Sequence, residues 1–153
     1  MKAVVTRVSG ASVRIDGVVN GSIDRGFLIL LGIGPNDTPQ HGRKLAEKIL
    51  GLRVFEDENG KLNLSLADIG GSVLVVSQFT LYGDCRKGRR PSFVGAASPE
   101  IAIPLYEQFL AHCEELGFPP QHGEFGADMK VESVNDGPVT LILDTDELME
   151  KKK

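Results

Sequence analysis

The segment from Phe27 to Ile33 constrains the fold most strongly, because it is a continuous apolar run bounded by glycines. A run of this length and composition predicts a strand that is buried on both faces of a sheet. The segment from Ser72 to Val76 predicts a second strand of the same kind. The sheet containing these strands must therefore have a layer of structure on each side.

Two segments have apolar residues at helical spacing. The first is a helix that starts after Thr38, a capping residue followed by proline, and ends at Gly51. The second follows Ser98 and ends at Gly117, but its regular part is predicted to begin near Pro104, because proline would break a helix begun earlier.

Shorter strands complete the prediction. They are expected at 3–8, 11–15, 18–19, 130–134 and 139–143, with turns at Asp16-Gly17 and Asn20-Gly21. The predicted fold class is α/β, with a mixed, strand-rich sheet and two main helices on one face. Further strands or a dimer partner are expected to cover the remaining face. Residues 1–145 are predicted to form a single domain, followed by a charged tail at 146–153.

Composition limits the kinds of protein to consider. The 153 residues are 41% hydrophobic and 25% charged, with a net charge of −4, as expected for one soluble globular domain. No apolar run approaches the ~20 residues that cross a bilayer, so we expect no membrane association and a cytoplasmic location. Cys85 and Cys113 are too few for a disulfide framework and are expected to be reduced.

The segment Ser77-Gln78-Phe79-Thr80 directly follows the second buried strand. At a strand end, the N–H groups of Phe79 and Thr80 could hold the oxyanion of an acyl-transfer reaction, with Thr80 as a weak nucleophile or a hydrogen-bonding group. The alternative is a strand running into a loop, with Phe79 in the core and the hydroxyls bonded to nearby backbone.

The segment from Asn135 to Thr140 lies about sixty residues further on and interrupts the last pair of strands. Gly137 would let backbone carbonyls come close to a ligand, and Pro138 could follow a cis peptide bond. The alternative is an ordinary turn between two strands.

A basic run follows the first of these segments, although the chain as a whole is acidic. It is interpreted either as a solvated loop or as a phosphate-binding surface, and its members are Arg86, Lys87, Arg89 and Arg90. The three histidines have no zinc-ligand spacing, so neither a metal nor a cofactor is predicted. Glycine loops at 32–37 and 83–88 lack the residues of a phosphate-binding motif.

The segments 77–80 and 135–140 together resemble the signatures of the D-aminoacyl-tRNA deacylases, also called D-tyrosyl-tRNA deacylases. Further likeness extends through most of the chain to about Leu143. It is carried by Arg7-Val8 with Ala11-Ser12-Val13, by 70–76, by Arg90-Pro91-Ser92-Phe93, by Ala97-Ser98-Pro99 and by Ala127-Asp128-Met129.

The resemblance implies a homodimer that hydrolyses the ester between a D-amino acid, or glycine, and the terminal ribose of tRNA. It implies a cis Gly-Pro peptide that enters the partner subunit's pocket and excludes L side chains. Such chiral proofreading would need no cofactor. The implied catalytic residues are Ser77, Gln78, Phe79 and Thr80; the implied substrate-binding residues are Gly137, Pro138, Arg7 and Met129; the basic run is expected to meet the tRNA acceptor end.

Two rival functions remain open. The first is a metal-free hydrolase that uses Ser77 or Thr80 on another small ester or amide. The second is a non-catalytic RNA-binding module that uses the basic run. The acidic balance of the chain and the lack of a stacking-aromatic motif count against the second.

Overall fold

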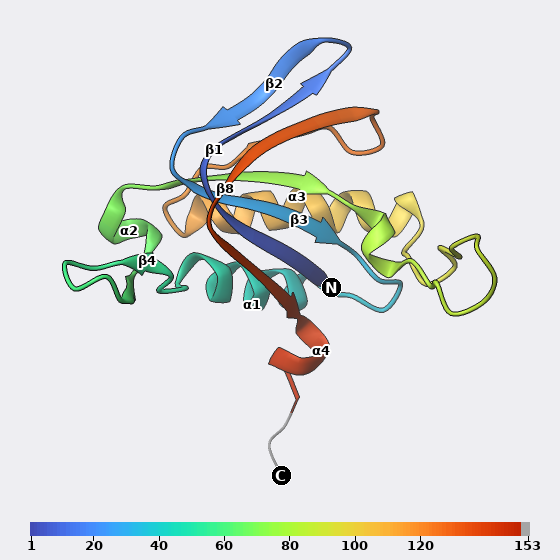
Figure 1. The fold of residues 1–153 in the computed structure, drawn as a ribbon. Coiled ribbons are helices and arrows are strands. Elements are labelled where there is room, and N and C mark those ends of the chain that lie inside the picture. Colours follow the sequence, from blue (N-terminus) through green and yellow to red (C-terminus); the bar gives the residue numbers. More distant parts are fainter. Residues whose placement is uncertain (151–153) are drawn as a thin grey trace.

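The computed structural model describes residues 1–150 as a six-stranded sheet with two long helices and several short elements (Figure 1). The strands of the main sheet are β1 (Lys2–Ile15), β2 (Val18–Ile23), β3 (Gly26–Gly32), β6 (Ser72–Ser77), β7 (Gln121–His122) and β8 (Met129–Asp144). A small hairpin joins β4 (Phe55–Glu56) to β5 (Leu62–Leu64). The helices are α1 (Pro39–Leu50), α2 (Leu66–Ile69), α3 (Pro99–Glu115), α4 (Thr145–Leu148) and the 3₁₀ turn η1 (Phe79–Tyr82).

The two predicted buried strands lie side by side at the centre of the sheet. β3 and β6 are parallel, β1 is antiparallel to β3, and β8 is antiparallel to β1 along nearly its whole length. β1 changes partner midway, pairing with β3 up to Val8 and with β2 from Ala11 onward. This change curls the sheet, so that Asn20 of β2 donates a hydrogen bond to the carbonyl of His122 in β7 at 2.7 Å.

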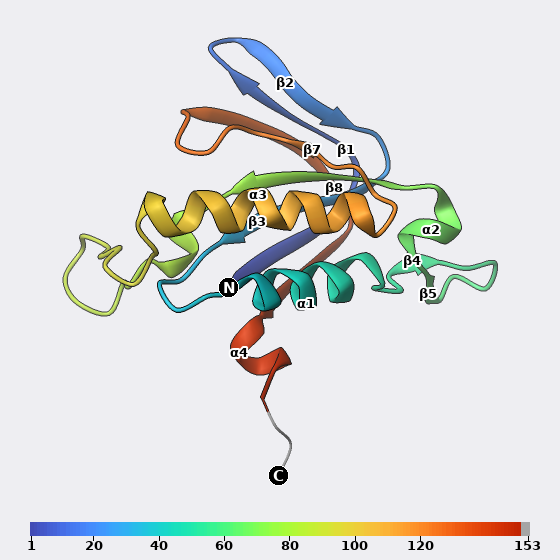
Figure 2. The same cartoon turned by 180° about the vertical axis from the view of Figure 1, so that it is seen from behind.

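Both long helices lie on one face of the sheet, where Figure 2 shows them in front of the strands. The main core is formed where α1 and α3 meet alternate residues of the central strands, such as Phe27, Ile29 and Val75. On the other face, the curled part of β1 and the end of β2 cover Leu28 and Leu74. The predicted fold class is confirmed.

The first predicted strands are longer than expected. The segments 3–8 and 11–15 belong to one strand, and β2 continues through the predicted turn at Asn20-Gly21. The β1–β2 register shifts there, because Val13 pairs with Gly21 and Arg14 pairs with Val19. Asn20 is thus the extra residue of a β-bulge, a feature whose composition resembles that of a turn.

The prediction that Pro104 delays the second long helix is wrong. α3 runs without interruption from Pro99 to Glu115. Pro104 removes one hydrogen bond to the carbonyl of Glu100, and both residues are exposed. Solvent can therefore bond that carbonyl, so the helix continues through the proline.

Part of the segment predicted as a charged tail is helical. α4 extends into it from Thr145 to Leu148, and Leu148 packs against the main core. Residues 151–153 lie outside the described residues. Between residues 1 and 150, no helix is both long and apolar enough to cross a membrane.

Candidate active site

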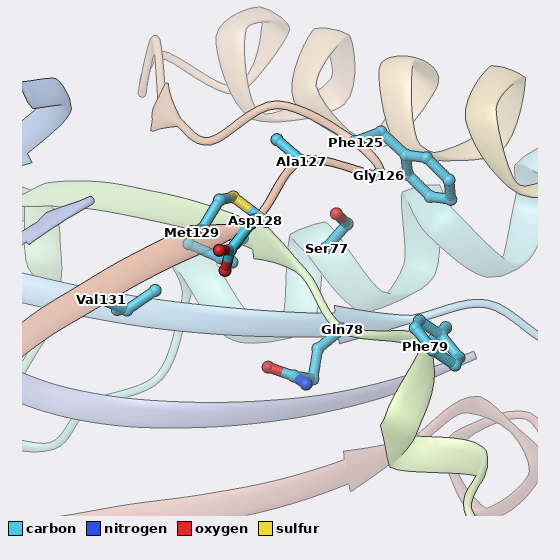
Figure 3. A pocket seen from close by; sticks show the side chains of 10 residues that line it. Ser77, Gln78, Phe79, Phe125, Gly126, Ala127, Asp128, Met129 and Val131 are labelled. Atoms are coloured by element: carbon cyan, nitrogen blue, oxygen red, sulfur yellow. The ribbon is translucent and has the colours of Figure 1, made fainter. Parts of the chain in front are cut away.

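A cavity of about 260 Å³ lies at the carboxyl end of β6 (Figure 3). Two segments far apart in sequence form its walls. These are the end of β6 with the residues after it, and the segment leading into β8. The lining residues are Val76, Ser77, Gln78, Phe79, Phe125, Gly126, Ala127, Asp128, Met129 and Val131.

The segment leading into β8 is held over β6 by backbone bonds and aromatic packing. β7 pairs in parallel with β6, and the Gly123 N–H donates to the Val75 carbonyl at 3.1 Å. The ring of Phe125 packs against Tyr106, with 5.9 Å between ring centroids, and the Tyr106 hydroxyl also donates to Val75. Burial raises the pKa of Tyr106 to about 12, so its hydroxyl stays protonated as a donor.

The end of β6 turns into η1 at Gln78, whose N–H donates to the Leu31 carbonyl at 2.7 Å. The first bond of the turn runs from the Leu81 N–H to the Gln78 carbonyl at 3.2 Å. The N–H groups of Phe79 and Thr80 precede this bond, and the first N–H groups of a helical turn have no acceptor within it. Main-chain donors are therefore available beside Ser77.

The side chains of this segment point in different directions. In Figure 3, Ser77 points toward the Phe125–Ala127 segment, whereas Gln78 points to the opposite side of the strand. The Gln78 amide donates a hydrogen bond to the Thr80 hydroxyl oxygen. Phe79 is 54% exposed, so the alternative that placed this ring in the core is wrong.

The cavity is almost uncharged. Among its described lining residues, Asp128 alone carries a charge, and its carboxylate pairs with Lys130 at 3.2 Å. Within residues 1–150, no group of three or more His, Cys, Asp or Glu side chains is arranged to hold a metal ion. Apart from this carboxylate, the polar groups that line the cavity are main-chain groups, the Ser77 hydroxyl and the Gln78 amide.

The segment from Asn135 to Thr140 forms a bulge within β8, where two separate strands were expected. Thr6 of β1 pairs with Thr140, and Val8 pairs with Asn135. Residues 136–139 therefore lie opposite Arg7 alone and project from the sheet. The peptide bond between Gly137 and Pro138 is cis, and both residues are exposed.

Arg7 supports this bulge from beneath. Its side chain is 5% exposed, and its Nε donates to the Asp136 carbonyl at 2.9 Å. Its Nη1 donates to the Val54 carbonyl at 2.7 Å, and Nη2 lies 3.7 Å from the Glu56 carboxylate. The guanidinium thereby ties the bulge to the β4 hairpin.

Asn135 closes the base of the bulge. Its Nδ2 donates to the Thr140 hydroxyl at 3.0 Å, and its Oδ1 accepts from the Val139 N–H at 3.1 Å. Both ends of the projecting segment are thus fixed by one side chain. Asn135 is thus a functional residue without a role predicted from the sequence, although it is the first residue of its motif.

The structure separates the predicted site residues into two groups. Four of them line the cavity, namely Ser77, Gln78, Phe79 and Met129. Thr80 directly follows Phe79 in the sequence. Arg7 contacts the bulge with Gly137 and Pro138, and none of these three lines the cavity. Sequence reasoning did not identify Phe125 or Gly126 as part of the site; the glycine, at a φ of +82°, was the available signal of a tight turn.

The basic run lies on a loop that extends from η1. Two backbone hydrogen bonds close the base of this loop. The Asp84 N–H donates to the Ser92 carbonyl at 2.7 Å, and the Ser92 N–H donates to the Asp84 carbonyl at 2.9 Å. Arg86 does not reach outward freely, because its Nη2 is 2.8 Å from the Asp84 carboxylate. This pairing lowers the pKa of Asp84 and raises that of Arg86. Lys87, Arg89 and Arg90 are exposed.

Solved structures confirm the architecture. A protein named c-Myc DNA Unwinding Element Binding Protein superposes with a TM-score of 0.88 at 44% identity, covering 94% of this chain and 98% of that one. A probable eukaryotic D-amino acid tRNA deacylase superposes with a TM-score of 0.79, over 93% of this chain and 97% of that one. At 16% identity, this second likeness shows the fold alone.

Curated relatives are similar along almost their whole length. The D-aminoacyl-tRNA deacylase of Desulfatibacillum aliphaticivorans is 59% identical over 145 residues, which are 95% of this chain and 99% of that protein. That of Thermus aquaticus is 58% identical over 147 residues, covering 96% and 97%. A family model described as D-Tyr-tRNA(Tyr) deacylase matches residues 4–144. The resemblance drawn from the two motifs is thus confirmed, and the chain belongs to the D-Tyr-tRNA(Tyr) deacylase family.

Proposed function

We propose that this chain hydrolyses the ester bond of D-aminoacyl-tRNA and releases the free D-amino acid and tRNA. The observation that carries the proposal is the match to the deacylase family over residues 4–144. The nearly uncharged cavity beside Ser77 agrees with it, because an aminoacyl ester is reactive enough to be cleaved without a strong side-chain base. The reaction would remove the D-amino acid from mischarged tRNA before translation. We place this reaction in the cytoplasm.

Main-chain groups supply the proposed catalysis. Water attacks the ester carbonyl, and the N–H groups of Phe79 and Thr80 stabilise the negative charge that develops on its oxygen. The departing ribose oxygen takes up a proton, and the neighbouring 2′-hydroxyl of the substrate can assist. Thr80 acts as an orienting group, held in place by its hydrogen bond from Gln78.

We propose further that the working form is a homodimer. Four apolar residues are cross-strand neighbours in succession over four adjacent strands. They are Ile142 of β8, Val4 of β1, Leu30 of β3 and the cavity-lining Val76 of β6. Cross-strand neighbours face the same side of a sheet, so these four residues form an apolar row that leads to the cavity. Ile142 is 79% exposed, so the outer end of the row is uncovered in a single chain. A second copy bound here would bury the row.

The second copy would also complete the site. Gly137 and Pro138 project from β8, and neither lines the cavity of its own chain. In the dimer, this loop would enter the cavity of the other subunit and wall it with main chain. A main-chain wall cannot move aside as a flexible side chain can, so an L side chain would clash, while a D side chain or glycine would fit.

The test is deacylation of D-tyrosyl-tRNA and L-tyrosyl-tRNA, with a chelator present. We expect cleavage of the D ester and at least about a hundredfold less of the L ester. Glycyl-tRNA should also be cleaved, because glycine has no side chain to exclude. Equal cleavage of both enantiomers, or of neither, would refute the proposal.

A second experiment separates the two possible roles of Thr80. Thr80→Ala should reduce turnover without abolishing it if the hydroxyl only orients, whereas Thr80→Ser should retain most of the activity. Complete loss in Thr80→Ala with unchanged D-aminoacyl-tRNA binding would instead indicate a nucleophile. A trapped acyl-enzyme would support the rival hydrolase that uses Ser77 or Thr80.

The basic run is proposed to meet the tRNA acceptor end. Because Arg86 is paired with Asp84, the main contribution is assigned to Lys87, Arg89 and Arg90. Neutralising these three should weaken tRNA binding and reduce its dependence on salt concentration. Binding of tRNA by the intact chain without any cleavage would favour the rival RNA-binding module.

A further inference from the structure

Two aromatic rings outside the core stand at the junction between the cavity and the basic loop. Phe79 and Phe93 pack edge to face, with 5.3 Å between centroids and 72° between ring planes. They remain 54% and 39% exposed. Large apolar rings left this open beside a candidate site are informative, because burial of each would otherwise stabilise the fold.

The position of Phe93 is fixed by the loop that carries it. The Asp84–Ser92 bridge brings the residue before Phe93 back to the start of the loop. The ring then lies against the backbone of Gly83, where an added Cβ would be 3.0 Å from Cε1 of Phe93. The ring is therefore held between Gly83 and Phe79, and Phe93 remains 39% exposed to solvent.

Positive charge lies on the same loop. Lys87, Arg89 and Arg90 fall between the two residues of the bridge, and all three are exposed. Proteins that bind single-stranded nucleic acid combine such charges, which contact the backbone, with aromatic rings on which bases stack. Phe93 and its loop present both features, although their spacing in the sequence matches no common stacking motif.

We propose that Phe93 is a stacking platform for the nucleobase that precedes the terminal adenosine of the tRNA. The inference rests on the proposed function, which places the terminal ribose ester beside the N–H groups of Phe79 and Thr80. Phe79 lines the cavity, whereas Phe93 lies one ring further out, toward the basic loop. The nucleotide next to the terminal one leaves the cavity in this direction, with its phosphate toward the loop cations.

The test compares a substrate that lacks this nucleotide with substrates that contain it. Cleavage by wild type, Phe93→Leu and Phe93→Tyr is measured on D-tyrosyl-adenosine, on the D-tyrosyl ester of the dinucleotide CpA, and on D-tyrosyl-tRNA. Leucine keeps apolar contact with Phe79 but removes the flat face, and tyrosine keeps the face. Val94→Ala is the matched control, because Val94 is 89% exposed on the same loop.

We expect Phe93→Leu to lower kcat/KM about tenfold on CpA ester and on tRNA, to leave the adenosine ester unchanged, and to be rescued in Phe93→Tyr. An equal loss on all three substrates would overturn the assignment, because the ring would then act through Phe79 or on the terminal adenosine. No loss on any of them would also overturn it.

Binding of the trinucleotide CpCpA without an attached amino acid, monitored by fluorescence titration, tests the role of Phe93 independently of cleavage. If the wild type cleaves no D ester, the proposed function fails, but weaker trinucleotide binding by Phe93→Leu than by Phe93→Tyr would still support the platform. Equal binding by the two variants would overturn it.

Discussion

The Ser77–Thr80 segment and the Asp136–Val139 bulge reach the surface by different means. The first continues directly from β6, whose residues Val73 to Val76 are buried, so its main chain is fixed by the core. The second projects from β8 where the β1–β8 register shifts, so residues 136–139 have no pairing partners in β1. It is fixed instead by the side chains of Arg7 and Asn135.

This difference predicts how each region responds to substitution. Side chains of the first segment are partly or fully exposed and support little of the fold, so changes there should affect activity more than stability. Changes at the supports of the second segment should lower the free energy of unfolding as well, because they remove hydrogen bonds that hold the bulge, those of the buried Arg7 side chain above all.

The largest effect on stability is expected for Arg7→Met. The substitution retains apolar volume but leaves the carbonyls of Val54 and Asp136 without their donors. The free energy of unfolding should fall by about 2–4 kcal/mol in urea denaturation. Arg25→Met is the matched control, since Arg25 is exposed and contacts the Phe55 ring at 5.3 Å; it should cost less than about 1 kcal/mol. Equal losses would contradict the special role of Arg7.

Gly137→Ala is expected to be next. At a φ of +131°, an added Cβ would lie 2.9 Å from Nη2 of Arg7 and 3.0 Å from Cγ2 of Val139. Unfolding free energy should fall by about 1–3 kcal/mol. Gly60→Ala is the control for backbone conformation alone, because Gly60 has a φ of +74° with no atom within 4 Å of the added carbon; it should cost about 1 kcal/mol.

Asn135→Ala should have a smaller effect, of about 1 kcal/mol, because its hydrogen bonds to Val139 and Thr140 are exposed. Deacylation should fall more than stability suggests, since the bulge would lose its fixed shape. Thr140→Val removes one of the two bonds and should fall between Asn135→Ala and wild type in both measurements. Unchanged activity in Asn135→Ala would show that the bulge keeps its shape without this side chain.

The smallest effect on stability is expected in the first segment. Thr80→Ala should change the free energy of unfolding by less than about 0.5 kcal/mol, because Thr80 is exposed and its hydroxyl is bonded only to Gln78 among the contacts described. Its deacylation should nevertheless fall. A stability loss as large as that of Arg7→Met would remove the contrast between the two regions.

The sequence predicted what depends on local pattern. Phe27 to Ile33 and Ser72 to Val76 had the apolar composition of buried strands, and this placed Ser77 at a strand end. It did not predict the bulges at Asn20 and Gly137, because a bulge and a turn share the same residues and differ in their pairing across the sheet. Nor did it reveal Phe125 in the cavity, since only the pairing of β7 with β6 brings that residue there.

The central claim is that two motifs separated within one chain form one site across two subunits. The most direct test mixes two inactive variants. One carries Thr80→Ala together with Gln78→Ala in the cavity, and the other carries Gly137→Ala together with Pro138→Ala in the loop. A mixed dimer would combine the intact cavity of one subunit with the intact loop of the other. After random exchange of equal amounts, we expect about one quarter of wild-type deacylation of D-tyrosyl-tRNA to return. A mixture that exchanges subunits but stays inactive would contradict the claim.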